Sequence, residues 1–187
     1  CDMFGHNSQM PQIFAGFGIR GGYIWRGTNL IDQRLARWRG ADGSELLTYR
    51  NGYCDFAIQV RHIDREDTVM EPEQVLDDLS QFLLKETATT EAGPILAFDG
   101  ADHTEWDPKF YAMLRQFGSI QNSGYRFVHS SFDTYLQELL PHREKITTFL
   151  DGELRQPGIR DASADQQWLI PGVLSSRVWI KQDNAVC

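Results

Sequence analysis

The most constraining feature of this sequence is an alternation of capped amphipathic helices with short, uninterrupted apolar runs. Apolar residues spaced three and four apart predict a helix in each of four segments, residues 10–17, 73–85, 108–117 and 131–139. The apolar runs between them have the length of strands and lie at residues 23–25, 95–98 and 125–128. Continuous apolar runs are typical of strands buried on both faces of a parallel sheet. The alternation therefore predicts an α/β fold of βαβ units, either an open sheet or a β/α barrel.

Two segments depart from this alternation. An Asp42-Gly43 turn between the strand-like runs 35–39 and 45–49 predicts a β-hairpin inserted into a long loop. From about residue 157 prolines and glycines become frequent, and residues 173–187 have the pattern of the first helix of another domain. We therefore expect a domain boundary near residue 160.

The predicted elements also imply how the chain packs. A single helix of crossover length connects residues 95–98 with residues 125–128, so we expect these two runs to form adjacent parallel strands. Helix 108–117 should then pack its apolar face on that sheet, and Leu114→Ala should be strongly destabilising. The residues of that face are Phe110, Met113, Leu114 and Phe117.

The composition limits the classes of partner. The 187 residues include 18 Lys and Arg against 26 Asp and Glu, a net charge of −8, whereas nucleic acids and anionic membranes bind basic surfaces. A hydrophobic content of 41% is enough for a folded core. Neither a membrane-spanning stretch nor a signal peptide is visible in the sequence. We therefore expect a soluble protein that binds neither nucleic acid nor membrane.

The cysteines and the first residues add two expectations. Cys1, Cys54 and Cys187 form neither a disulfide framework nor a metal-binding C-x-x-C spacing, which favours a reducing compartment such as the cytoplasm. The sequence starts at Cys1, and residues 2–6 begin in the middle of a pattern with no helix cap or strand before them, so we expect the chain to be a fragment of a longer polypeptide.

Polar side chains follow the predicted strands, where a parallel α/β fold collects its functional groups. Asp99 and Asp102 follow the second apolar run, and Arg26 closes the first. Asp2 precedes the first helix in the same relative place. Two carboxyl groups, an arginine and aromatic rings on one rim suit a carbohydrate, because the carboxyls supply acid, base and nucleophile.

Ordinary explanations stay open for each of these residues. Asp99-Gly100 has the sequence of a simple turn, Asp2 that of a capping residue, and Arg26 that of one half of a surface ion pair. Three histidines are equally well explained as surface or hydrogen-bonded residues, namely His6, His103 and His129.

The motifs taken together resemble those of the glycoside hydrolase family 38 alpha-mannosidases. The segment Asp2–Ile13 resembles the family's D-x-F-G-H-x-x-Q-x-P-Q-I stretch. The resemblance spans essentially the whole chain in the style of the bacterial members. It continues in family order through Trp25-Arg26-Gly27, Asp42-Gly43-Ser44, Asp99–His103, Gly152–Arg155 and Pro171–Asn184.

This resemblance implies a retaining, metal-dependent alpha-mannosidase with a seven-stranded β/α barrel and a helical middle domain. Asp2 is implied as nucleophile and metal ligand, and Asp102 as the acid/base. Arg26 and Tyr53 fall near positions that line the family's sugar pocket. The implied cofactor is zinc or another divalent cation, and the implied substrate is a mannose-containing oligosaccharide or glycoside. Asp2 and Asp102 should then lie on one rim, with their carboxyl groups roughly 5–5.5 Å apart in a closed site.

The resemblance also implies what this chain lacks. The family's metal-binding H-x-D segment is absent, and Ile170-Pro171 stands where many relatives carry a metal-binding histidine. Asp2 is therefore the one metal ligand implied, and we expect the chain by itself to be inactive. Residues 1–160 are implied to be the C-terminal part of the barrel, and residues 161–187 the start of the helical middle domain.

Two other functions stay open at this point. One is a non-catalytic sugar-binding protein that keeps the pocket without the metal. The other is a metal-dependent polysaccharide deacetylase, which needs an H-x-x-x-H pair of ligands that this sequence lacks. Linkage preference is not determined by the sequence, and homo-oligomerisation stays open.

Overall fold

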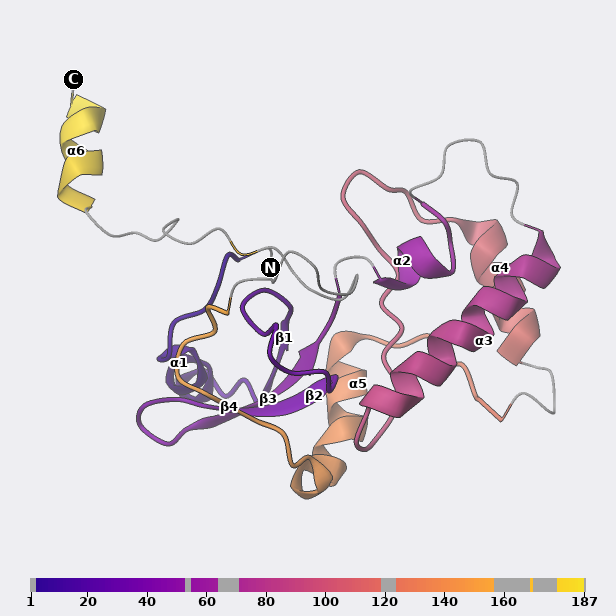
Figure 1. Ribbon diagram of the computed structural model, residues 1–187, viewed down its shortest axis with the longest axis horizontal. Helices are drawn as coiled ribbons and strands as arrows, with labels where there is room; N and C mark the ends of the chain where they lie inside the picture. The colour runs from indigo at the N-terminus through magenta and orange to yellow at the C-terminus, as the bar shows by residue number, and fades with distance from the viewer. Residues whose placement is uncertain are drawn as a thin grey trace.

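The computed structural model of the chain describes residues 3–52, 55–63, 71–118, 124–156, 169 and 178–186. No helix in this part combines the length and apolar character that crossing a lipid bilayer requires. The elements follow one another as α1 (Met10–Gly16), β1 (Gly21–Ile24), β2 (Leu35–Arg39), β3 (Glu45–Arg50), α2 (Asp55–Gln59), α3 (Pro72–Thr89), α4 (Pro108–Gly118), α5 (Phe132–Leu139), the 3-10 helix η1 (Leu140–Lys145), β4 (Phe149–Asp151) and α6 (Val178–Val186) (Figure 1).

The four strands form one mixed sheet in the order β1-β3-β2-β4. β1 runs parallel to β3, and β2 runs antiparallel to β3 and parallel to β4. The hairpin predicted around Asp42-Gly43 is thus confirmed as β2 and β3. Asp42 closes the turn by accepting hydrogen bonds from the backbone N–H and the hydroxyl of Ser44, at 3.0 and 2.6 Å.

Each face of the sheet carries its own apolar cluster, because alternate residues of a strand point to opposite faces. On one face Trp38 and Leu46 pack with Met10 and Phe14 of α1. On the other face strand residues pack against Tyr135 and Leu139 of α5. Both faces are therefore covered by helices, α1 on one and α5 on the other.

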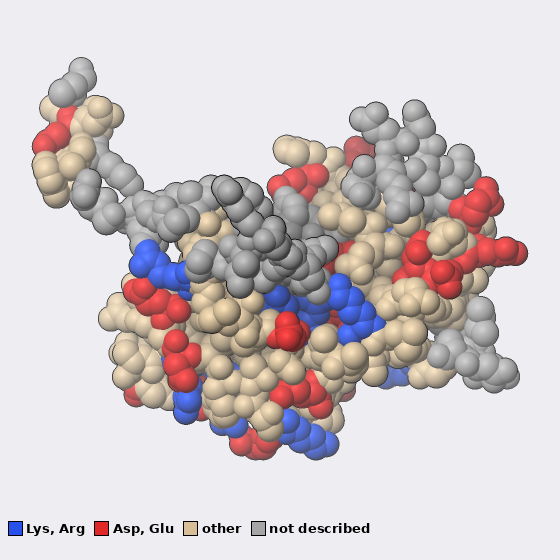
Figure 2. Space-filling model, viewed as in Figure 1, with Lys and Arg blue, Asp and Glu red and all other residues tan. Residues whose placement is uncertain are grey.

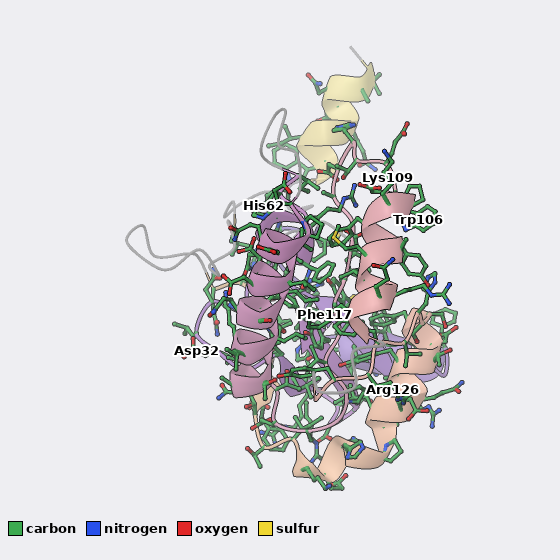
Figure 3. The ribbon with its side chains drawn as sticks, turned by 90° about the vertical axis from the view of Figure 1, so that its right-hand side faces the viewer. Asp32, His62, Trp106, Lys109, Phe117 and Arg126 are labelled. Atoms are coloured by element: carbon green, nitrogen blue, oxygen red, sulfur yellow. The ribbon has the colours of Figure 1, made fainter. Side chains whose placement is uncertain are left out.

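A third apolar cluster joins α2, α3 and α4 beside the sheet (Figures 1 and 3). Phe110 of α4 is 1% exposed in this cluster, and Phe117 packs between α3 and α4. Asp107 caps α4 by accepting hydrogen bonds from the backbone N–H groups of Lys109 and Phe110 at 2.8 and 3.2 Å. The apolar face of α4 meets α2 and α3, and Phe117 also contacts the Phe127 ring at 5.5 Å, but the prediction that this face packs on a sheet is wrong because residues 95–98 and 125–128 form no strand.

Residues 95–98 and 125–128 form no strand, so the prediction that they are adjacent parallel strands is wrong. Their side chains are only partly buried: Ile95 packs on the helical cluster and Leu96 on the sheet cluster, whereas Phe98 and Val128 are exposed. What they lack in the described residues is a neighbouring backbone to pair with. The fold is accordingly a mixed α/β fold with a four-stranded sheet, and a seven-stranded barrel is not confirmed.

The remaining helices follow their sequence signals closely. Ser131 caps α5 by accepting a hydrogen bond from the Thr134 N–H at 3.2 Å, and the helix gives way to η1 at Pro141. The acidic residues near the start of α3, among them Glu73 and Asp77, are exposed to solvent (Figure 2). The boundary predicted near residue 160 lies outside the described residues.

Candidate functional site

The carboxyl ends of β1 and β3 meet at one edge of the sheet because these two strands are parallel. Trp25 and Arg26 follow β1 at this edge, and Asn51 and Gly52 follow β3. The backbone N–H of Asn51 donates to the Ile24 carbonyl at 2.9 Å, which ties the two strand ends together. Tyr53 comes next in the sequence and lies outside the described residues.

Three of the sequence motifs meet beside this edge. The N–H and C=O of His6 pair with the C=O and N–H of Leu154, both at 3.0 Å. Two residues further on, the N–H of Gln156 donates to the Gly27 carbonyl at 3.2 Å. The segment 154–156 therefore runs between the segment 4–6 and the end of β1.

Glycine is required on both sides of this segment. Gly5 and Gly27 have φ angles of +105° and +84°, which L side chains rarely adopt. A Cβ on Gly5 would lie 2.9 Å from the Leu154 carbonyl oxygen, and one on Gly27 would overlap that oxygen. The F-G-H and W-R-G motifs thus owe their glycines to the close approach of a third segment.

Arg26 lies against the segment that follows Asp2. Its guanidinium carbon is 4.5 Å from the centroid of the Phe4 ring, a cation–π contact. Arg26 is half-buried, so it is more than one half of an exposed ion pair. Asp2 itself, two positions before Phe4, lies outside the described residues.

Asp102 is exposed and lies in the loop between residue 98 and α4. The loop starts beside the end of β1, because the Phe98 ring lies 5.1 Å from that of Tyr23. His103 follows with a φ of +59°, and the Thr104 hydroxyl donates to the Ala101 carbonyl at 2.8 Å. Asp102 is therefore presented by a closed turn and not by the end of a strand.

Asp99 is more than a turn residue. Nη1 of Arg61 donates to both Asp99 carboxylate oxygens, at 3.0 and 3.2 Å. The Arg61 side chain is 9% exposed and that of Asp99 is 23% exposed, so the ion pair is shielded from water on one side. Sequence reasoning missed Arg61, since nothing in its neighbourhood in the sequence links it to a loop 38 residues later.

A buried polar network lies behind the sheet edge and was also missed. Nε of Arg34 donates to both Glu86 oxygens at 2.9 and 3.0 Å, and its Nη2 donates to Asp55 at 3.3 Å. Tyr49 Oη lies 2.8 Å from Glu86. Burial, followed by the negative charge of Glu86, raises the pKa of the Tyr49 hydroxyl well above its ordinary value. The network joins β2 and β3 to α2 and α3.

One sequence signal points to this network. Glu86 continues the apolar stripe of α3, which places a carboxylate on the helix face that should be buried. A charged residue on such a face requires a buried partner. The partner itself, Arg34, is 52 positions away and cannot be identified by spacing.

The described residues hold no group of three His, Cys, Asp or Glu side chains that would bind a metal ion. His6 packs edge-on against Trp38 at 5.7 Å, and burial lowers the pKa of its imidazole. His129 Nδ1 lies 2.8 Å from the Tyr111 hydroxyl. These two histidines have the ordinary structural roles that the sequence left open, and the predicted ligand Asp2 lies outside the described part.

Comparison with known proteins identifies this combination of fold and motifs. The family model of the glycosyl hydrolases family 38 N-terminal domain matches residues 1–152. The match contains the segments around His6 and Gly27 and ends two residues before Leu154. The class is therefore that of the glycoside hydrolases, and the chain belongs to glycosyl hydrolase family 38.

Two solved structures share the fold. An alpha-mannosidase from Enterococcus faecalis V583 superposes with a TM-score of 0.63 at 19% identity, over 82% of this chain. A protein in the glycosyl hydrolase family 38 from Enterococcus faecalis superposes with a TM-score of 0.53 at 17% identity, over 80% of this chain. This chain spans 17% and 15% of those two proteins. No curated protein sequence gives a significant match.

Proposed function

We propose that this chain is part of a retaining alpha-mannosidase in which Asp2 is the nucleophile and Asp102 the acid/base. The observation that carries the proposal is the contact of Arg26 with Phe4, at 4.5 Å, within a chain of family 38. It brings the segment that begins with Asp2 to the end of β1. The ring contact between Phe98 and Tyr23 brings the start of the Asp102 loop to the same strand end.

Two carboxyl groups are sufficient for each bond change. A carboxylate oxygen of Asp2 attacks the anomeric carbon, the bond to the leaving oxygen breaks, and the proton of Asp102 goes to that oxygen. Asp102, now a carboxylate, then takes a proton from water. The water oxygen attacks the anomeric carbon and releases the Asp2 carboxylate, so two inversions give net retention.

Arg26 and Tyr53 are proposed to bind the sugar. Arginine N–H groups donate to hydroxyl oxygens, and the contact of Arg26 with Phe4 limits the directions in which its guanidinium can point. The aromatic ring of Tyr53 would supply a stacking face and a hydroxyl. The substrate is a terminal alpha-mannosidic bond in an oligosaccharide or a simple glycoside.

Asp2 is the one residue that we propose as a ligand for zinc or another divalent cation. The described residues do not fit a complete metal site, because they gather no three ligand side chains. No step above therefore passes through a metal. We place any further ligands outside the described residues.

The proposal includes the wider architecture of the protein. Residues 1–160 would belong to the C-terminal part of a β/α barrel, and residues 161–187 would begin a helical domain that includes α6. A cytoplasmic location and a possible self-association are further expectations. A non-catalytic sugar-binding relative is the alternative, and turnover separates it from the enzyme.

The test uses the complete polypeptide that carries this chain, with an activated aryl alpha-mannoside. Proton NMR of the first-formed sugar should show the α-anomer, because the mechanism retains configuration. Asp2→Ala should abolish turnover, since no nucleophile remains. Asp102→Ala should slow an aryl mannoside with a poor leaving group far more than one with a good leaving group, because only the poor one needs a proton. A β-anomeric first product, or an active Asp2→Ala variant, would refute the proposal.

A further inference from the structure

Arg61 holds both ends of the loop that carries Asp102. Its Nη1 donates to the two Asp99 oxygens at 3.0 and 3.2 Å, and its Nη2 donates to the backbone carbonyl of Glu105. Asp99 and Glu105 lie three residues before and three residues after Asp102. One guanidinium therefore fixes the distance between the two stems of this loop.

Arg61 is itself held on both sides in the sequence. Val60 is fully buried in the cluster of α2, α3 and α4. His62 Nε2 lies 2.8 Å from Asp78 Oδ2 of α3. Figure 3 shows His62 near one end of α3 and Trp106, the neighbour of Glu105, near the same end of α4. The guanidinium thus links the loop to the packed cluster of α2, α3 and α4.

The backbone on either side of this contact is unusual. Among the described residues, His62 and His103 are the non-glycine residues with positive φ, at +54° and +59°. They directly follow Arg61 and Asp102. A non-glycine residue in the left-handed region is strained, so surrounding contacts must hold it there, and such residues concentrate at functional sites. The turn at Asp102 is therefore maintained by contacts outside itself, and those of Arg61 span it.

The stretch before the loop is held by side chains and not by a strand ladder. Tyr135 Oη donates to the Pro94 carbonyl at 3.2 Å, and Tyr49 Oη lies 3.1 Å from the Leu96 carbonyl oxygen. Beyond Leu96 the backbone forms no strand before α4 begins. Arg61 is the side chain that continues this support across residues 99–105.

We propose that Arg61 is a positioning residue for the general acid Asp102. This inference rests on the proposed function, because it assumes that Asp102 protonates the leaving oxygen. A displacement of about 1 Å in a reacting group costs roughly a hundredfold in rate. Loss of Arg61 releases both stems of the loop, so it weakens the protonation step and leaves the attack by Asp2 largely unaffected.

The test compares two substrates in the complete polypeptide, an aryl alpha-mannoside with a good leaving group and one with a poor leaving group. Arg61→Ala should lower kcat/KM for the poor leaving group about a hundredfold and for the good one only a few-fold. Arg61→Lys should fall between, because an ammonium group is a compact donor that cannot reproduce the planar fork. In the double variant Arg61→Ala/Asp102→Ala, the loss of Arg61 should add little to the effect of Asp102→Ala alone.

Arg39 supplies a matched control. It donates to both oxygens of Asp151 at 2.7 and 3.0 Å, a bidentate but more exposed pair between β2 and β4. Arg39→Ala should leave the ratio of the two kcat/KM values unchanged. Asp99→Asn is the second variant if Arg61→Ala does not fold, and it should change the ratio in the same direction as Arg61→Lys.

Each outcome decides between the proposals. If Arg61→Ala and Asp99→Asn lower kcat/KM equally for both substrates, or leave both values unchanged, the ratio of the two values does not change and the inference is overturned. If Asp102→Ala is still selective for the poor leaving group in that case, the proposed function stands. If Asp102→Ala itself shows no such selectivity, the assignment of the acid fails, and the inference fails with it.

Discussion

Glu86 accepts hydrogen bonds from Nε of Arg34 on both of its carboxylate oxygens, at 2.9 and 3.0 Å, and both side chains are 2% exposed. This buried pair connects α3 to the residue that precedes β2. Asp55, at the start of α2, receives a further hydrogen bond from the same arginine at 3.3 Å. The sheet edge and the helical cluster are thus fixed to each other by a charged network and not by apolar contacts alone.

Glu86→Ala should lower the free energy of unfolding by about 3–5 kcal/mol, because it leaves the Arg34 guanidinium buried without its principal partner. Urea denaturation of the complete polypeptide measures the change. Arg34→Met/Glu86→Leu should recover only part of the loss, since neither charge of the pair is then buried but the buried Asp55 loses its contact with Arg34. Glu153→Ala, which removes a half-exposed partner of Arg155, should cost less than about 1 kcal/mol. If Glu86→Ala lowers the free energy of unfolding no more than Glu153→Ala does, Glu86 is not the principal partner of a buried Arg34.

Gly27→Ala should destabilise the protein by more than about 2 kcal/mol, since the new methyl group overlaps the Leu154 carbonyl at a positive φ. Gly43→Ala is the control. Gly43 has nearly the same φ, +83°, with no atom near its missing Cβ, so only the backbone strain of about 1 kcal/mol applies. Similar melting temperatures for the two variants would mean that segment 154–156 does not press on Gly27.

Tyr49→Phe should change how stability depends on alkaline pH. Burial and the charge of Glu86 raise the pKa of Tyr49 above the ordinary 10.0, so the folded state favours the protonated phenol. As the pH rises, the unfolded chain loses this proton first. The stability that protonated Tyr49 contributes below pH 10 is therefore lost progressively above pH 10. The difference in unfolding free energy between wild type and Tyr49→Phe should therefore be constant at neutral pH and shift against the wild type above about pH 10. Parallel pH curves for the two proteins would show that Tyr49 ionises normally.

Phe110→Ala should cost about 3–5 kcal/mol, because this ring is 1% exposed at the centre of the helical cluster. Leu114→Ala should cost less, since Leu114 is only partly buried at the margin of the same cluster. This ranking replaces the expectation of a large effect at Leu114, which assumed that α4 packs on a sheet. Thermal unfolding of the two variants measures it, and a larger loss for Leu114→Ala would restore the earlier expectation.

The sequence predicted the elements that depend on neighbouring residues. Helices form at 108–118 and 132–139, where the spacing of apolar residues predicted them, and Asp42-Gly43 forms the expected turn. The strands expected at 95–98 and 125–128 did not form, because pairing depends on a second backbone that local pattern cannot supply. The burial expected for these runs was also wrong, since Phe98 and Val128 are exposed.

The candidate site was predictable only as separate motifs. The sequence singled out Arg26 and Asp102, and both lie in the described residues, whereas Asp2 and Tyr53 lie outside them. It could not indicate Arg61, whose effect on the Asp102 loop acts across 38 positions through one side chain. Contacts of this kind depend on how α2 packs against α3, which no local signal encodes.

The passage of residues 154–156 between His6 and Gly27 also sets an order of events during synthesis. Asn29 Nδ2 donates to the Gln156 carbonyl across 127 positions, and the backbone hydrogen bonds between His6 and Leu154 span a longer stretch still. His6, Gly27 and Asn29 therefore cannot form these hydrogen bonds until the ribosome has released the chain beyond Gln156. The hairpin and the capped helices, whose contacts are local, can form long before that. A nascent chain stalled before this point would leave the backbone groups of His6 and Gly27 without their partners in segment 154–156.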